Sequence, residues 1–189
     1  MAGEAKVVTY LTRIAAAAAV FFSIISVSQA TLIGDTVDIS VHFPNLGTIV
    51  SSDSVVVGAG IEIGCPGPSP LCGIGNGLLD GESIDIGDFT IDLTFLFDFA
   101  SASFAGFVFE SLTLGSPITG FLLDTNIAGL GASRITFGGD FLRINMAGLG
   151  VGSVGITLLT GTQVPEPASL ALLGGGLAAL GLLRQRRRS

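Results

Sequence analysis

Residues 89–99 read FTIDLTFLFDF, and an apolar side chain occupies every second position of this stretch. Successive side chains of a β-strand point to opposite faces of the sheet, so a period of two is typical of a strand with one buried face. The apolar set consists of Phe89, Ile91, Leu93, Phe95, Phe97 and Phe99. We expect this face to anchor the hydrophobic core of a β-domain.

The residues just before this stretch keep the same period in the opposite phase. Ile84 and Ile86 are apolar at even positions, whereas the following strand is apolar at odd positions. A shift of one residue moves every side chain to the other face of a sheet, so a turn or bulge must reset the register in between. Gly87-Asp88 is the expected position of this turn.

Strand signals continue through residues 31–163, where no stretch has the period of an amphipathic helix. Residues 36–43, TVDISVHF, alternate in the same way and predict a strand. Further strands are expected over residues 49–57, 61–63, 104–112, 118–123, 134–137, 141–146 and 154–159. Gly138-Gly139-Asp140 predicts a hairpin turn. Many short strands with a shared apolar face favour an all-β fold, an antiparallel, jelly-roll-like β-sandwich over residues 31–163.

The N-terminal end has the three parts of a secretory signal peptide. Lys6 and Arg13 are basic, an apolar run follows over residues 14–27, and Ser28-Gln29-Ala30 forms a small-residue cleavage site. We expect a signal helix within residues 1–30, which signal peptidase removes by cleavage after Ala30. Basic residues at both ends of the chain stay cytoplasmic, which places residues 31–163 on the far side of the inner membrane.

The C-terminal end also has three parts: VPEP at residues 164–167, an apolar run over residues 168–183, and a basic tip. The tip arginines are Arg184, Arg186, Arg187 and Arg188. A helix over the apolar run spans roughly 24 Å, which is short of a hydrocarbon core of about 30 Å. Because snorkelling arginines can make up the difference, we expect a temporary transmembrane helix, with a permanent tail anchor as the alternative.

The order of Val164, Pro165, Glu166 and Pro167, the apolar run and the arginine cluster resembles the PEP-CTERM sorting signal. The resemblance covers residues 164–189 and concerns routing. It implies a Gram-negative envelope, removal of the tail by an exosortase-type membrane protease, and delivery to the cell surface or the extracellular space. The protein would be membrane-anchored before this processing. The resemblance also implies an association with exopolysaccharide production.

Residues 31–163 are strongly acidic. They contain thirteen aspartates and glutamates against two bases, Arg134 and Arg143, an excess of eleven negative charges. Binding to nucleic acid needs lysines and arginines that replace phosphate counterions, so this composition excludes a nucleic-acid partner. We expect the acidity to serve solubility outside the cell, with weak association of divalent cations as the alternative.

Cys65 and Cys72 are the only cysteines, and they bracket the segment PGPSPL. An exported protein meets an oxidising compartment, so we predict that the two residues form a disulfide. A redox site of the Cys-x-x-Cys type has a different spacing, and a metal site would need further ligands. We interpret the pair as a staple on a surface loop.

Candidates for catalysis are few. His42 is the only histidine, and it lies on the polar side of a predicted strand with no nucleophile motif nearby. A carboxylate pair among the acidic residues 80–92, as in glycosidases, is the other route, but a solvated acidic face explains these residues better. We predict no catalytic residue, no enzymatic activity and no cofactor.

Asp80, Glu82 and Asp85 are weak candidates for a calcium site. They lie in the segment LDGESID at residues 79–85, and hard cations prefer several oxygen ligands from one loop. The segment lacks the spacing of an EF-hand and its terminal bidentate glutamate. We therefore predict no metal site. If a calcium site exists, these three residues are its candidate ligands.

The leading functional hypothesis is a non-enzymatic surface or extracellular-matrix protein associated with the cell envelope or the exopolysaccharide layer. The alternative is a lectin-like carbohydrate-binding module. Such modules use exposed aromatic side chains, but the chain has no tryptophan, and its one tyrosine, Tyr10, lies in the predicted signal peptide. The expected partners are signal peptidase, the exosortase-type protease, the membrane before processing, and exopolysaccharide.

Overall fold

The structure is a computed structural model that describes residues 31–161. The predicted signal peptide, with its cleavage site at Ala30, lies outside the described residues. The predicted tail, with Val164 to Pro167 and the arginine tip, lies outside them as well. Within residues 31–161, no helix is long and apolar enough to cross a membrane.

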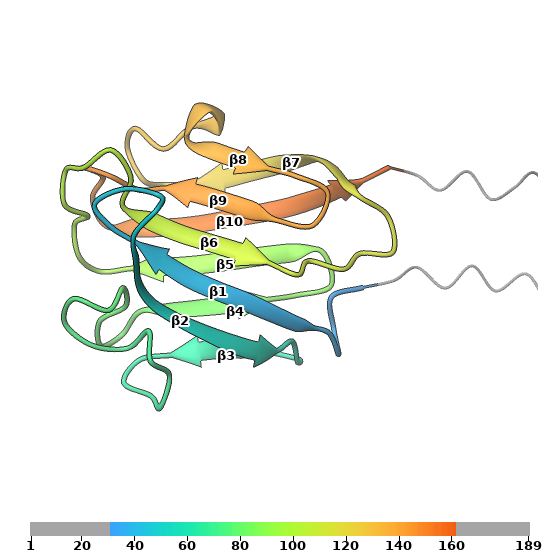
Figure 1. Cartoon of the computed structure of the whole chain (residues 1–189), viewed down its shortest axis with the longest axis horizontal. Helices are drawn as coiled ribbons and strands as arrows, with labels where there is room; N and C mark the ends of the chain where they lie inside the picture. The colour runs from blue at the N-terminus through green and yellow to red at the C-terminus, as the bar shows by residue number, and fades with distance from the viewer. Residues whose placement is uncertain (1–30, 162–189) are drawn as a thin grey trace, which may run out of the picture.

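The described residues form two five-stranded antiparallel sheets (Figure 1). The strands are β1 (Thr36–His42), β2 (Ile49–Val56), β3 (Ile61–Gly64), β4 (Ser83–Ile86), β5 (Thr90–Phe95), β6 (Gly106–Glu110), β7 (Ile118–Thr125), β8 (Ile135–Phe137), β9 (Leu142–Asn145) and β10 (Gly152–Thr160). A 3₁₀ helix, η1 (Ala132–Arg134), precedes β8. The expectation of an all-β antiparallel fold is confirmed.

The strands follow the order β2-β1-β6-β9-β8 in one sheet, here called sheet A, and β3-β4-β5-β10-β7 in the other, sheet B. This order differs from the two Greek keys of an eight-stranded jelly roll. Three successive strands, β3, β4 and β5, lie side by side as a meander, and the first and last strands, β1 and β10, belong to different sheets. The sandwich-like pair of sheets is therefore as expected, but the order in which the chain connects the strands differs from that of a jelly roll.

The core lies between the two sheets, on the faces that the alternation of apolar residues marks. In β5, Ile91, Leu93 and Phe95 are buried, and the polar residues between them are exposed. The Phe95 ring of sheet B stacks on Phe107 of sheet A at a centroid distance of 5.5 Å, and Phe107 lies 6.4 Å from Phe109. This row of aromatic rings joins the sheets at the centre of the domain.

One part of the expectation for residues 89–99 is wrong. The strand β5 ends at Phe95, and the Phe97 side chain is 52% exposed. The chain leaves the sheet because the backbone amides of Leu96 and Phe97 donate to the carboxylate of Glu82. Phe99 still reaches the core, where its ring packs edge-on against Phe95 at 5.0 Å.

The two turns expected from glycine are confirmed. Between β4 and β5, the Gly87 amide donates to the Thr90 carbonyl at 2.9 Å, and Ile86 then pairs with Ile91. Between β8 and β9, the Gly138 amide donates to the Phe141 carbonyl at 3.0 Å. Each turn brings the apolar residues of its two strands onto the same face of a sheet.

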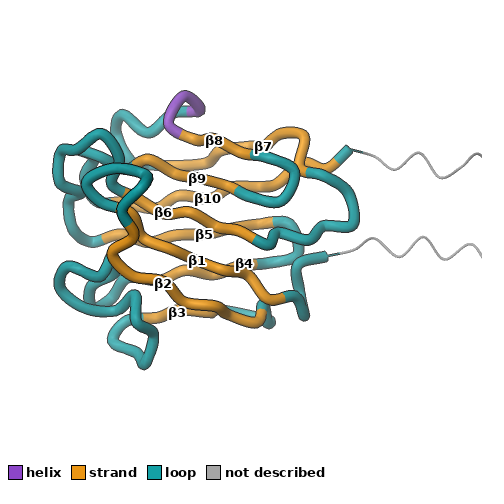
Figure 2. Tube along the Cα trace, in the orientation of Figure 1, coloured by secondary structure: helices purple, strands orange, loops and turns teal. Residues whose placement is uncertain are grey.

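Both ends of the described chain lie at one end of the molecule, where β1 begins and β10 finishes (Figure 1). The loops that join the strands gather at this end and at the opposite one (Figure 2). We call the opposite end the distal end. It consists of the loops at residues 43–48, 65–82, 96–105, 126–134 and 146–151.

Candidate functional site

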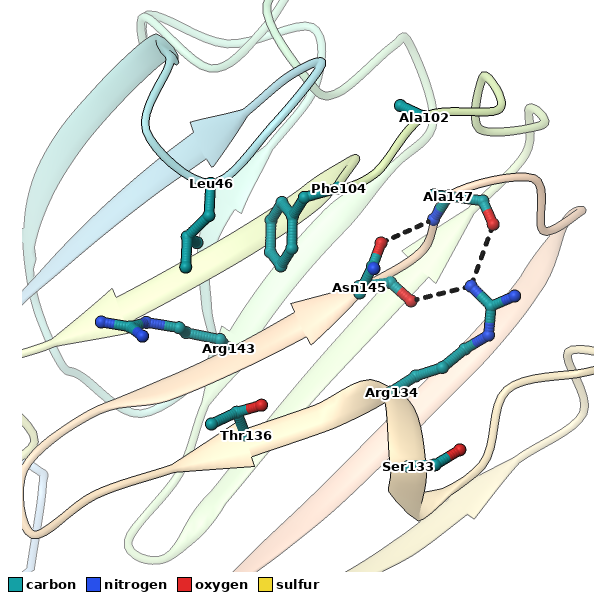
Figure 3. A pocket seen from close by; sticks show the side chains of 9 residues that line it. All are labelled: Leu46, Ala102, Phe104, Ser133, Arg134, Thr136, Arg143, Asn145 and Ala147. Atoms are coloured by element: carbon teal, nitrogen blue, oxygen red, sulfur yellow. Dashed lines mark hydrogen bonds between the residues drawn. The ribbon is translucent and has the colours of Figure 1, made fainter.

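Both basic side chains of the described residues, Arg134 and Arg143, line one pocket (Figure 3). We call it the arginine pocket. It has a volume of about 340 Å³ and lies on the outer face of sheet A toward the distal end. Its other lining residues are Leu46, Ala102, Phe104, Ser133, Thr136, Asn145 and Ala147. No acidic residue lines the pocket, although the described residues carry thirteen acids.

Strand pairing places Arg143 beside β8, and η1 places Arg134 at the start of the same strand. Arg143 lies between the buried residues Leu142 and Ile144 of β9, so its own side chain points outward from sheet A. Thr136 of β8 pairs with Arg143, and Arg134 stands two residues before Thr136. Arg134 is the last residue of η1, directly before β8, and its side chain lines the same pocket as that of Arg143.

Hydrogen bonds to backbone carbonyls hold Arg134. Its Nη1 donates to the Ala147 carbonyl at 2.9 Å and to the Asn145 carbonyl at 3.4 Å (Figure 3). The Asn145 side chain supports the same wall, since its Oδ1 accepts from the Ala147 amide at 3.1 Å. A guanidinium has five N–H donors, so the other nitrogens of Arg134 retain donors for a ligand.

Arg143 is held by an aromatic ring. Its guanidinium carbon lies 4.4 Å from the ring centroid of Phe141, within the range of a cation–π interaction. The Nε of Arg143 is buried and has no hydrogen-bond partner among the described residues. An unmet buried donor costs about 1–3 kcal/mol. Neither arginine forms an ion pair with a described carboxylate.

His42 supports the wall of the arginine pocket. It is buried, which corrects the expectation that it faces solvent. Its Nδ1 lies 2.6 Å from the Leu46 carbonyl, and its Nε2 lies 2.8 Å from the Ser40 hydroxyl. A carbonyl can only accept, so Nδ1 donates to Leu46, and in the neutral ring Nε2 accepts from Ser40. His42 also packs edge-on against Phe104, so it orients two residues that line the pocket.

The Ser40–His42 hydrogen bond has the form of a nucleophile and its base, but its surroundings do not favour catalysis. Ser40 lies in the middle of β1 and pairs with Ser52 on one side and Val108 on the other. The backbone amides nearby belong to strand pairing, so they are not arranged as an oxyanion hole. We interpret the pair as a structural support of the loop at residues 43–48.

The three weak calcium candidates do not come together as a site. Glu82 is buried, and its carboxylate accepts from the backbone amides of Leu79 at 2.8 Å, Leu96 at 2.7 Å and Phe97 at 3.2 Å. Asp80 is exposed in a loop, and Asp85 lies on β4. Among the described residues, no group of three or more potential ligands is placed to hold a metal ion. Glu82 closes the end of β5 instead.

Cys65 and Cys72 form the predicted disulfide, with their Cα atoms 5.6 Å apart. It closes the first part of the long loop at residues 65–82 of the distal end. The Leu71 and Leu78 side chains of the same loop are fully buried. The interpretation of the pair as a loop staple fits this position.

An acidic row crosses the outer face of sheet B. Asp85 pairs with Asp92, and Gly155 pairs with Asp92 on one side and with Asp124 on the other. Partial burial raises the pKa of Asp92, and the charges of Asp85 and Asp124 raise it further, while a hydrogen bond with Thr90 opposes them. A raised pKa means that the fold favours the protonated carboxyl.

We expect Asp92→Asn to raise the midpoint of thermal unfolding at pH 7. Between the unfolded and the folded pKa the native state binds more protons, so stability falls as the pH rises through this window. The difference between the variant and the wild type should close near pH 3, where the carboxyl is protonated in both states. Thermal unfolding at both pH values checks this, with Asp98→Asn as the charge-matched control. A variant less stable than the wild type at pH 7 would contradict the prediction.

Comparison with known proteins finds a sorting motif in the C-terminal part of the chain. A family model described as the PEP-CTERM protein-sorting motif matches residues 163–188. The chain is a PEP-CTERM domain-containing protein. The motif implies export, processing by exosortase, a membrane protease, and a surface or extracellular location after processing. No curated protein and no solved structure matches the chain.

The arginine pocket lies far from Gly161, the last described residue, at the other end of the described domain. Gly161 lies at the end of the molecule where β10 finishes, and in the sequence the matched motif begins two residues later, at residue 163. The pocket lies toward the distal end, formed where β1 and β9 finish and where β6 and β8 begin.

Sequence reasoning counted Arg134 and Arg143 but did not identify them as a site. A signal was present, because the two bases flank the predicted hairpin turn at residues 138–140. Pairing outward from that turn places residue 143 opposite residue 136, which follows Arg134 by two positions. The contributions of Leu46 and Phe104 had no comparable signal, since both come from loops far along the chain.

Proposed function

We propose that this PEP-CTERM protein is a non-enzymatic component of the cell surface or extracellular matrix, associated with the envelope or the exopolysaccharide layer. The sorting motif at residues 163–188 carries the proposal, because it directs the attached domain out of the cell. Before processing, the apolar run at residues 168–183 anchors the protein in the membrane, and exosortase then separates the domain from the arginine tip.

The character of the domain supports a structural role. Its lone histidine, His42, is engaged by Ser40 and Leu46. The buried carboxylate of Glu82 is engaged by three backbone amides. His42 and Glu82 thus serve the fold, and a strongly acidic surface suits a protein that must stay soluble outside the cell.

The test of the proposal is the intact mass and the location of the protein in its native host. We expect the native protein to lack both residues 1–30 and the arginine tip, and to be recovered from the surface or the medium. The variant with Pro165, Glu166 and Pro167 all changed to alanine should keep its tail and stay in the inner membrane. Thr162→Ala, just outside the matched residues, is the control. Retention of the arginine tip by the wild-type protein would overturn the proposal and indicate a permanent anchor.

The arginine pocket favours carbohydrate binding as a second candidate function. The exposed hydroxyls of Ser133 and Thr136 make no hydrogen bond with another described residue, so they are available to sugar hydroxyls. Its aromatic residue is Phe104, in place of the tryptophan or tyrosine common in sugar sites. Binding of the protein to an array of glycans, compared between the wild type and Phe104→Leu, would test this candidate. If the variant still bound every glycan that the wild type binds, the result would argue against the pocket as a sugar site.

A further inference from the structure

We propose that the arginine pocket binds an acidic saccharide through the oxyanion of a carboxylate or sulfate group. The inference rests on the second candidate function, carbohydrate binding, and names the class of its ligand. Arg134 and Arg143, the two bases of the described residues, face this one pocket. On a domain with an excess of eleven negative charges, the pocket is the place where an anion is attracted rather than repelled.

The two guanidinium groups are prepared for such a ligand. Arg134 is oriented by the carbonyls of Asn145 and Ala147, and Arg143 by the ring of Phe141. Neither charge is paired with a described carboxylate, and the Nε of Arg143 lacks a hydrogen bond. Oriented donors lose little freedom when a ligand arrives, and the planar guanidinium suits the oxygens of a carboxylate or a sulfate.

Figure 3 shows the two arginine side chains extending in different directions, with Thr136 on β8, the strand that pairs with the strand of Arg143. The positive charges are therefore spread along the pocket rather than focused on one point. A saccharide fits this arrangement, because its anionic group can meet one guanidinium while its hydroxyls reach Ser133 or Thr136. A neutral saccharide would cover both charges without pairing them, which costs free energy.

The position of the pocket agrees with a ligand outside the cell. It lies toward the distal end, away from the end where the chain continues into the sorting motif. A long polyanion would meet the acidic surface around the pocket and be repelled. The pocket volume of about 340 Å³ instead suits a short section of a polymer, such as one acidic sugar and its neighbours.

Titration calorimetry of the protein recovered from its host, with three oligosaccharide probes, tests the inference. The probes are an oligogalacturonate, a sulfated dextran oligomer and neutral dextran of similar length. We expect one or both acidic probes to bind and neutral dextran to bind at least tenfold more weakly. Binding of the first probe alone identifies a carboxylate ligand, and binding of the second alone identifies a sulfate ester. Equal binding of neutral dextran, or binding of no probe, would overturn the inference.

Substitutions locate the binding. Arg143→Gln should lower the affinity for the acidic probe at least tenfold, because it removes a guanidinium that forms no ion pair within the protein. Arg134→Lys keeps the positive charge but loses the planar, forked set of N–H donors of the guanidinium, so we expect a smaller loss of affinity for the acidic probe. Thr119→Asp, which makes the same change in net charge near the opposite end, is the control. Equal weakening by Thr119→Asp and Arg143→Gln would show a general charge effect and refute the pocket.

The thermal midpoint of each variant separates lost binding from lost folding. Arg143→Gln should leave this midpoint within a few degrees of the wild type, since the side chain of Arg143 makes no hydrogen bond with a described residue and its backbone pairing is unchanged. Failure of the sorting test would leave these binding results unchanged, because the pocket lies in the described domain and not in the tail. A failed binding test would likewise leave the result of the tail-processing experiment unchanged.

Discussion

Phe107→Ala should lower the free energy of unfolding by about 4 kcal/mol, because it leaves a cavity at the centre of the core. Phe107 is fully buried, and its ring lies between those of Phe95, at 5.5 Å, and Phe109, at 6.4 Å. The ring of Phe99 also packs against it at 6.2 Å. The substitution therefore removes the aromatic contact between Phe107 of sheet A and Phe95 of sheet B.

Denaturant unfolding of the exported protein measures this effect. Phe97→Ala is the matched control, since Phe97 belongs to the same alternating stretch as Phe95 but is 52% exposed. We expect the control to lower the free energy of unfolding by less than about 1 kcal/mol. Similar losses for the two variants would mean that Phe97 packs in the core and that β5 continues past Phe95.

Glu82→Ala should lower the free energy of unfolding by about 3 kcal/mol. The substitution removes one carboxylate that accepts from three backbone amides, and it leaves these donors without their partner. Glu82 joins its own loop, through Leu79, to the end of β5, through Leu96 and Phe97. We therefore expect the loop at residues 65–82 to become more open to protease in the variant, before global unfolding.

Asp80→Ala is the control for Glu82→Ala, because Asp80 is exposed two residues away. It should change the free energy of unfolding by no more than about 0.5 kcal/mol. Thermal unfolding with and without millimolar calcium completes the comparison. A calcium-dependent rise of the midpoint in the wild type that both variants lose would contradict the structural role and restore the calcium interpretation.

The location of the strands could be predicted because alternation is a local signal. The positions of β1, β5, β8 and β9 follow from residues within each strand, and the turns at Gly87-Asp88 and Gly138-Gly139-Asp140 follow from glycine between apolar runs. The disulfide was equally accessible, because the chain offers one possible pair. The sorting motif is a contiguous stretch at the C-terminal end, so its recognition needed no fold.

The end of β5 could not be predicted from the alternation. The pattern continues through Phe97 and Phe99, but the amides of Leu96 and Phe97 bind a carboxylate from residue 82. A hydrogen bond between residues that are fourteen positions apart depends on where the loop at residues 65–82 folds back. For the same reason, His42 was expected on the solvent side and is buried, because the loop at residues 43–48 closes over it through Leu46.

The sequence by itself determined an exported, acidic, all-β protein with a stapled loop and a sorting motif, since each of these properties resides in composition or in neighbouring residues. The tertiary structure alone decided the strand order and the meeting of Leu46, Phe104, Arg134 and Arg143 around one pocket. These residues come from four separate segments, and their distances follow from how β1, β6, β9 and β8 pair. Pairing between strands distant in the sequence depends on the free energy of the whole sheet, which no local pattern specifies.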